Sequence, residues 1–373
     1  MEIENWYRNN FEARLGGRYI TSKMILPLLN EYKNKFKISI VGASEKDKNI
    51  HLIKIGNGGK TILAWSQMHG NESTTTKAIF DLLKFLNQKD FFQNEIQNFL
   101  NTYSLYVIPI LNPDGAALYT RENVNGIDLN RDAQKLSQSE SRCLRTVFDT
   151  LKPSMCLNMH DQRTIYGFDN GMPATVSFLS PAANAARSVT KARMVAMKNI
   201  VRMNNCLQKF IPGQVGRYDD SFNSACVGDT FQMEGVPTIL FEAGHYKDDY
   251  KREKTREFIF YALLTLFDIM GGRQKVDYND YFAIPENRNN YRDIIIRNAK
   301  LASHTSLKDA AIQYVEVLNN GVIIHVPHLD EIGGLEKLFG HLEIDAQGSE
   351  ILTNTDKTLT YGVKVSDIIG FRA

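Results

Sequence analysis

Short apolar stretches that alternate with helical patterns are the feature that most limits the fold of this chain of 373 residues. The clearest of them are almost continuously apolar and are bounded by Gly, Pro or Asn. Such strands are typical of a sheet buried on both faces, and the helical segments between them predict a largely parallel or mixed sheet. Ligands of such sheets bind beyond the carboxyl ends of the strands. The stretches are Thr61–Met68, Tyr103–Leu111, Met155–Met159 and Thr238–Phe241.

Other segments of the first 271 residues fit the same α/β pattern. The first thirty or so residues are expected to be mostly helical. From Ser73 onward apolar residues recur at helical spacing, and two later stretches also predict helices. The additional strands are Lys37–Val41 and His51–Ile55, and the later helices are Ala183–Phe210 and Glu253–Met270.

The composition changes after Gly271-Gly272. Residues 275–300 are polar and rich in Asn, Arg and Tyr, and short strand-like stretches follow them. We therefore expect a large domain over residues 1–271 and a small β-rich domain over residues 272–373. The histidines of this second part have no metal-ligand spacing, so ordinary surface or core positions are expected for them. Its strand candidates are Gln313–Leu318, Val322–Val326, Leu342–Ile344 and Thr360–Val365, and its histidines are His304, His325, His328 and His341.

Composition and charge exclude several classes of protein. Hydrophobic residues make up 43% of the chain and charged residues 23%, as in an ordinary soluble domain. The net charge of +2 gives no basic field for nucleic acid. The longest apolar run, Phe258–Phe267, is too short for a membrane span, and the N-terminus lacks the pattern of a signal peptide. These features predict a cytoplasmic protein with no membrane or nucleic-acid partner. The cysteines, Cys143, Cys156, Cys206 and Cys226, form no C-x-x-C pair and are expected to be free thiols.

Polar residues follow several of the predicted strands. His69 and Glu72 stand three residues apart between a strand and a helix, where they could bind one Zn²⁺ from one side. His160 ends another strand and is the natural third ligand, which leaves a fourth position for water. A lone His-x-x-Glu pair is weak evidence for a metal, and a core histidine is the alternative interpretation of His160.

The remaining fragments give these residues a context. The set of motifs resembles the zinc carboxypeptidase family of the carboxypeptidase A type, in the family's order over roughly residues 60 to 250. Residues after 272 lie outside the resemblance. It implies a three-layer α/β/α sandwich around a mixed, mostly parallel, eight-stranded sheet, and one Zn²⁺ held by His69, Glu72 and His160. The motifs are His69-x-x-Glu72, Asn112-Pro113-Asp114-Gly115, Asp128-Leu129-Asn130-Arg131, His160 and Phe241-Glu242.

The resemblance also implies roles in peptide hydrolysis. Asn130 and Arg131 would bind the free C-terminal carboxylate of a peptide, since a planar guanidinium donates two parallel hydrogen bonds to a carboxylate. Arg121 would polarise the scissile carbonyl and stabilise the oxyanion. Glu242 would be the general base that takes a proton from zinc-bound water.

The residues that would select the substrate side chain are less well defined. Tyr218 is the nearest candidate for the family tyrosine that closes over the substrate. The side-chain pocket is expected at Cys226–Thr230, where Gly228 would leave room and Asp229 would favour a basic group. Arg163 and His245, which are unusual next to these motifs, could contact substrate or serve as supporting or surface groups.

Three functions are consistent with this inventory. The first is a zinc-dependent metallocarboxypeptidase, which could act on cell-wall peptides, including bonds to diaminopimelate, as family relatives do. The second is a zinc deacylase of N-acyl amino acids, of the aspartoacylase or succinylglutamate desuccinylase kind. The third is a non-catalytic binding module. The intact Asn-Pro-Asp-Gly and the long segment before Glu242 favour the peptidase, and the complete set of ligands argues against a binding module. Oligomeric state and side-chain preference are not predicted.

Overall fold

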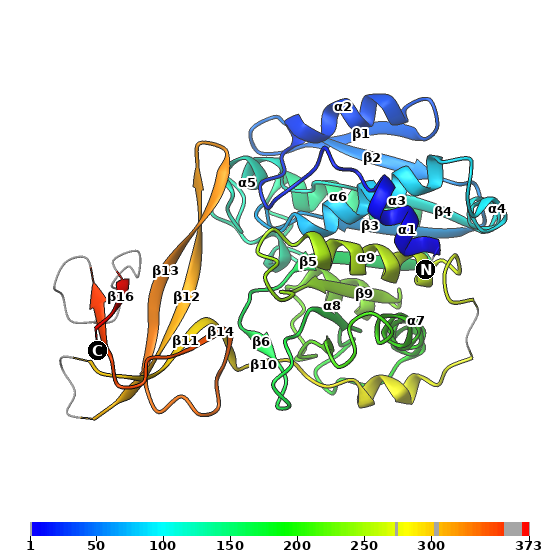
Figure 1. Ribbon diagram of the computed structural model, residues 1–373. Helices are drawn as coiled ribbons and strands as arrows, with labels where there is room; N and C mark the ends of the chain where they lie inside the picture. The colour runs from blue at the N-terminus through cyan, green and yellow to red at the C-terminus, as the bar shows by residue number, and fades with distance from the viewer. Residues whose placement is uncertain (1, 273–274, 302–305, 354–367, 373) are drawn as a thin grey trace.

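The computed structural model describes residues 2–272, 275–301, 306–353 and 368–372. Within these residues, eight strands form one sheet in the order β1-β2-β4-β3-β5-β9-β7-β8 (Figure 1). The central strands β4, β3, β5 and β9 are mutually parallel, and antiparallel pairs flank them. The strands are β1 (Lys37–Ala43), β2 (Asn49–Ile55), β3 (Lys60–Ser66), β4 (Tyr103–Ile108), β5 (Met155–Asp161), β7 (Val176–Leu179), β8 (Val215–Arg217) and β9 (Thr238–Ala243).

Helices cover both faces of this sheet, as the continuously apolar strands predict. In β3, Ile62 and Ala64 pack into the core cluster on one face, while Leu63 and Trp65 pack into the cluster on the other. The first cluster includes α1, α2, α3, α4, α7 and α9, and the second includes α6 and α8. The helices are α1 (Glu2–Asn10), α2 (Ser22–Tyr32), α3 (Thr74–Asn87), α4 (Gln93–Thr102), α5 (Pro113–Leu118), α6 (Ser139–Leu151), α7 (Lys191–Leu207), α8 (Val227–Met233) and α9 (Glu253–Leu266), with the 3₁₀ turns η1 (Leu129–Arg131) and η2 (Tyr278–Ala283).

The predicted α/β sandwich is therefore confirmed, with differences in detail. The strands β7 and β8 were not predicted, because four and three residues are too few to show a periodic pattern. The helix α7 begins at Lys191, eight residues later than the predicted Ala183, because the side chain of Thr190 caps it by accepting a hydrogen bond from the backbone N–H of Arg193. None of the helices among the described residues is long and apolar enough to cross a membrane.

A second, smaller sheet follows the large one. Its four described strands run in the order β13-β12-β11-β14, and β15 and β16 form a separate pair. The long β12–β13 hairpin stands beside α5 (Figure 1). Three predicted strands lie within β12, β13 and β14, whereas the predicted strand Thr360–Val365 and His304 lie outside the described residues. The strands are β11 (Tyr291–Ala299), β12 (Lys308–Asn319), β13 (Val322–Gly333), β14 (Phe339–Asp345), β15 (Glu350–Thr353) and β16 (Ile368–Arg372).

The segment between the two sheets is attached to the large unit. Tyr281 and Ile284 are buried in its core, and β10 (Arg288–Asn289) pairs with β6 (Tyr166–Gly167). The expected boundary at residue 272 stays a prediction.

A buried histidine, His245, and a half-buried one, His341, meet where the small sheet joins the large unit. The rings of His245 and His341 lie 4.2 Å apart between centroids, and Nε2 of His341 is 2.7 Å from the carbonyl oxygen of Thr164. Burial lowers the pKa of His341 to about 4. Burial, and then the neighbouring His341, hold the pKa of His245 well below its usual range. Both rings are therefore neutral at neutral pH.

We predict that this junction weakens in acid. The unfolded chain binds a proton at His341 near the ordinary pKa of 6.5, whereas the folded chain does so only near 4. The contribution of His341 is therefore complete above pH 6.5 and is lost as the pH falls to 4, and it amounts to about 3 kcal/mol. His341→Gln should reduce the loss of unfolding free energy between pH 7 and 4.5 in urea titrations. His328→Gln on β13 controls for removing a histidine elsewhere in the sheet, and equal pH dependence in both variants would contradict this account.

Candidate metal centre

The carboxyl ends of β3, β5 and β9 lie side by side. β5 pairs with β3 on one side and with β9 on the other. In the β5–β9 register His160 is the direct partner of Glu242. β3 leads into the loop that carries His69 and Glu72 and then into α3. Neighbouring parallel strands thus bring together polar residues that are far apart in the sequence.

His69, Glu72 and His160 form one buried cluster. Their candidate ligand atoms all lie within 4.8 Å of one another. Oε1 of Glu72 is 2.8 Å from Nδ1 of His69, and its Oε2 is 2.8 Å from Nδ1 of His160. The two Nδ1 atoms are 3.1 Å apart. Burial alone would raise the pKa of Glu72, but the two histidines hold it well below the usual range.

This donor set fits a zinc ion. Tetrahedral Zn²⁺ with Zn–N distances of 2.0–2.1 Å places its ligand atoms about 3.3 Å apart. Both imidazoles turn the same nitrogen, Nδ1, toward the carboxylate. Nε2 of His69 lies 3.0 Å from Oδ1 of Asp128, a contact that favours a proton on Nε2 and a free lone pair on Nδ1. The three predicted ligands therefore form a possible metal-binding group.

Asp128 supports this group, although no separate role is predicted for it from the sequence. Besides the contact with His69, its Oδ2 accepts a hydrogen bond of 3.1 Å from Nε of Arg121. Burial would raise the pKa of Asp128, but the hydrogen bond and charge of His69 and the charge of Arg121 hold it below the usual range. The signal for this residue was its place in the Asp-Leu-Asn-Arg motif.

The Asn-Pro-Asp-Gly turn packs against the metal-binding loop. Oδ1 of Asn112 accepts a hydrogen bond of 2.8 Å from the N–H of Gly115, and its Nδ2 donates to the carbonyl of Met68 at 3.2 Å. Gly70 leaves no room for a side chain, because a Cβ there would lie 2.0 Å from the carbonyl carbon of Gly115. β4 already ends at Ile108, so the motif does not end its strand as predicted. Asn112 instead caps α5, and the motif fixes the loop that carries His69.

Glu242 lies beside the cluster and has no ionic partner in the part of the chain that the structure describes. Its side chain is buried, and Oε2 has no hydrogen-bond partner among the described residues. Burial, and then the nearby carboxylates of Glu72 and Asp161, hold its pKa well above the usual range, while Arg121 opposes this effect. A buried carboxyl group of this kind is common at functional sites.

One cavity of about 740 Å³ joins these residues to the predicted substrate-binding ones. Arg163, Cys226, Gly228 and Asp229 also border it, whereas His245 does not and lies instead at the junction with the small sheet. The position of His245 gives it no contact with this cavity. The predicted site residues that line the cavity are His69, Glu72, Arg121, Asn130, Arg131, His160, Tyr218 and Glu242.

The two predicted carboxylate-binding residues are placed differently. Oδ1 of Asn130 accepts a hydrogen bond of 3.0 Å from the N–H of Val227. Arg131 is exposed and donates from Nη1 to the carbonyl of Asn130 at 2.8 Å and to Sγ of Cys226 at 3.2 Å. Among the described residues it has no carboxylate partner. Its charge is therefore available to a ligand in the cavity.

Arg121 and Tyr218 lie at other sides of the cavity. Arg121 reaches Oε1 of Glu72 from Nη1 at 3.3 Å and so stands directly beside the metal-binding group. The hydroxyl of Tyr218 is 2.7 Å from that of Tyr166, a cavity residue that the sequence did not suggest. Burial raises the pKa of the Asp229 carboxyl to about 6.

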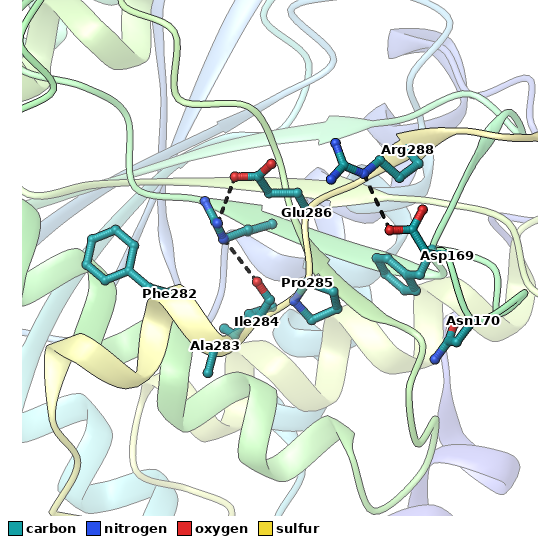
Figure 2. A pocket seen from close by; sticks show the side chains of 10 residues that line it. Asp169, Asn170, Phe282, Ala283, Ile284, Pro285, Glu286 and Arg288 are labelled. Carbon is teal, nitrogen blue, oxygen red and sulfur yellow. Dashed lines mark hydrogen bonds and ion pairs between the residues drawn. The ribbon is translucent and has the colours of Figure 1, made fainter.

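A separate cavity of about 470 Å³ lies between residues 168–170 and 282–288 (Figure 2). Arg217 pairs with Glu286 at 2.7 Å, and its Nε donates to the carbonyl of Ile284 at 3.0 Å. Nε of Arg288 lies 3.9 Å from Oδ2 of Asp169. The two arginines of this cavity thus face carboxylates of the same cavity. Its described lining residues include no group comparable to His69, Glu72 and His160.

Comparison with known proteins agrees with this geometry. The sequence model of the zinc carboxypeptidase family matches residues 22–168 of this chain. Carboxypeptidase M of Mus musculus is 24% identical over 174 residues, which are 40% of this chain and 39% of the relative. Carboxypeptidase 2 of Trichophyton rubrum is 28% identical over 104 residues, 27% of this chain and 19% of the relative. The chain thus matches about two-fifths or less of the length of these relatives.

Solved structures share the fold of the large unit. A metallo-carboxypeptidase from Burkholderia cenocepacia superposes with a TM-score of 0.54 at 14% identity, over 67% of this chain and 70% of that one. One from Pseudomonas aeruginosa, in complex with (2-guanidinoethylmercapto)succinic acid, gives a TM-score of 0.53 at 17% identity over the same shares. The resemblance to the zinc carboxypeptidase family and the predicted fold are thus confirmed.

We predict that Asp128 raises the affinity of the centre for zinc. Asp128→Asn should weaken zinc binding about 10- to 100-fold, because partners of metal-binding histidines contribute effects of this size. Competition with a chromophoric chelator measures the affinity directly. Asp47→Asn, in an exposed turn that does not line the cavity, is the matched control. Wild-type affinity in a folded Asp128→Asn protein would show that this contact does not support the metal.

Proposed function

We propose that this chain is a zinc-dependent metallocarboxypeptidase that hydrolyses the C-terminal amide bond of a peptide. One observation carries the proposal: a convergent His-Glu-His cluster shares a cavity with a buried, unpaired carboxyl group and an arginine that has no carboxylate partner among the described residues. A metal site, a base and an anchor for a substrate carboxylate are what this reaction requires.

His69, Glu72 and His160 would hold one Zn²⁺. When bound, the ion would polarise the scissile carbonyl and lower the pKa of a water molecule. Asp128 keeps His69 oriented, and Glu72 is held in place by both histidines. The ligand set is therefore preorganised by contacts within the chain.

Glu242 is the proposed general base. It is the register neighbour of His160, and it lines the same cavity as the metal-binding group. A bound cation would offset the repulsion from Glu72 and Asp161 and so favour the carboxylate form of Glu242. In that form it would accept a proton from the attacking water and then transfer it to the leaving amine.

The arginines would orient the peptide. Arg131, with Asn130 beside it, would bind the terminal carboxylate. Arg121 stands next to Glu72 and would stabilise negative charge that develops on the scissile carbonyl oxygen. Tyr218 would cover the substrate from another side of the cavity.

The other two functions have weaker support. A zinc deacylase of N-acyl amino acids would use the same ligand chemistry, but the similar proteins described above are carboxypeptidases. A binding module would not need Glu242 as an unpaired buried carboxyl group, which is costly to keep without a use. Both are kept as outcomes of the tests below.

We expect Glu242→Gln to retain zinc but to turn over at least ~10²-fold more slowly, the usual contribution of a general base. Metal content by mass spectrometry and kcat on a hydrolysed peptide separate binding from catalysis. Glu95→Gln on the exposed surface of α4 serves as the control for an equivalent amide substitution. Full activity in Glu242→Gln would rule out this mechanism.

We also expect hydrolysis to depend on the free terminus of the substrate. A short peptide acid should be cleaved with a kcat/KM at least about tenfold higher than the same peptide with a C-terminal amide, because the amide removes the charge that pairs with Arg131. The panel should include peptides ending in diaminopimelate and N-acyl amino acids. Preferential hydrolysis of the acyl amino acids would identify a deacylase, and no turnover of any compound by the zinc-loaded protein would favour a binding module.

A further inference from the structure

A smaller cavity of about 360 Å³ lies between the metal centre and the β12–β13 hairpin. The residues that it shares with the larger cavity are Glu72, Arg121, Asp161, Gln162 and Arg163. Its outer wall comes from Tyr314 and Val315 of β12 and His325 of β13, which lie outside the segment that resembles carboxypeptidases. Asn130 and Arg131 line the larger cavity and not this one. The two cavities therefore extend from the metal centre in different directions.

An ion network that is buried at Arg18 and Asp161 and half-buried at Glu316 fixes this wall. The guanidinium of Arg18 pairs with Asp161, which directly follows His160, and its Nε lies 3.1 Å from Oε1 of Glu316 on β12. The hydroxyl of Tyr119 also donates to Glu316. Burial would raise the pKa of Glu316, but Arg18 holds it below its usual range. The hairpin is therefore held in a set position relative to the metal ligands.

The carboxylates of the cavity already have partners. Glu316 and Asp161 pair with Arg18, and Asp293 accepts hydrogen bonds of 3.0 Å from the hydroxyl of Tyr250 and 2.7 Å from the N–H of Tyr314. Glu72 belongs to the metal-binding group. The negative charge of the wall is thus used within the chain and would not attract a cationic ligand.

Arg163 differs from the other arginines of the cavity. Arg121 is bonded to Glu72 and Asp128, and Arg252 donates to the main-chain carbonyls of Ala243 and Gln162 at 2.9 and 3.1 Å. Arg163 is exposed and has no carboxylate partner among the described residues. Because it borders both cavities, three residues beyond His160, it is placed to meet a ligand that crosses the metal centre.

We propose that Arg163 is a specificity-determining residue that binds a carboxylate on the acyl side of the scissile amide, in the cavity that the hairpin closes. The inference rests on the proposed function. If Arg131 binds the terminal carboxylate in the larger cavity, the part of the peptide before the scissile bond extends toward the smaller one. The substrate class is then peptides whose residue next to the C-terminus is acidic.

The test compares three peptides that differ only in that residue, with Glu, Gln or Lys before the same C-terminal residue. For the zinc-loaded wild-type chain, kcat/KM for the Glu peptide should exceed that for the Gln peptide at least about fivefold, as expected for charge-assisted hydrogen bonds. Arg163→Gln should bring the ratio to within about twofold of one, and Arg163→Glu should turn the preference toward the Lys peptide. Arg8→Gln, on the exposed face of α1, should keep the wild-type ratio.

The outcomes separate the two levels of the proposal. Hydrolysis of all three peptides without preference for Glu would overturn the role of Arg163 and leave the carboxypeptidase proposal standing. If the preference for the Glu peptide is unchanged in Arg163→Gln, another residue binds the acidic side chain and the role of Arg163 is overturned. Absence of zinc-dependent hydrolysis for every peptide would overturn both proposals. Raising the salt concentration should reduce the Glu preference in the wild type, and an effect that salt does not change would also count against a charge contact.

Discussion

The buried carboxylate of Glu72 is the constraint on which the site depends. A carboxylate removed from water is costly unless positive or hydrogen-bonding partners replace the lost hydration. Here the Nδ1 atoms of His69 and His160 supply them, each at 2.8 Å. Since the two histidines come from the ends of neighbouring strands β3 and β5, this contact holds only if the strands are in register. The geometry of the centre is therefore a direct consequence of the parallel sheet.

Charge compensation spreads outward from this point in two directions. On one side Asp128 receives hydrogen bonds from His69 and Arg121, so the imidazole is oriented and Arg121 is kept next to the centre. On the other side Asp161, next to His160 in sequence, is paired with Arg18, which also holds Glu316 of the small sheet. The small sheet is thus connected to the metal-binding strands through paired charges, and not only through its apolar contacts.

The sequence predicts those parts of the molecule that are encoded locally. Apolar runs such as Met155–Met159 identify the central strands, and the ordered motifs identify the cluster that the structure assembles. The short strands β7 and β8 carry too few residues for a pattern. Arg18 and Glu316 are separated by 298 positions, so no local sequence pattern predicts their contact. The same limit applies to Asp128, whose function comes from the side chains that it meets, and to His245, whose place beside His341 depends on how the small sheet docks.

The metal ligands and the β12–β13 hairpin belong to different sheets, and this separation has a consequence for substrate selection. The metal ligands sit at strand ends, and their buried charges compensate one another, so a substitution among them would leave a partner without its counterion. Residues on the β12–β13 hairpin face the same space from outside the sheet, and the side chains of Tyr314 and Val315 take no part in that compensation. Changes at these positions could reshape the acyl side of the cleft at little cost to the centre. A rigid sheet edge that holds the chemistry, joined through Arg18 to a separate wall, allows specificity to vary while the reaction stays the same.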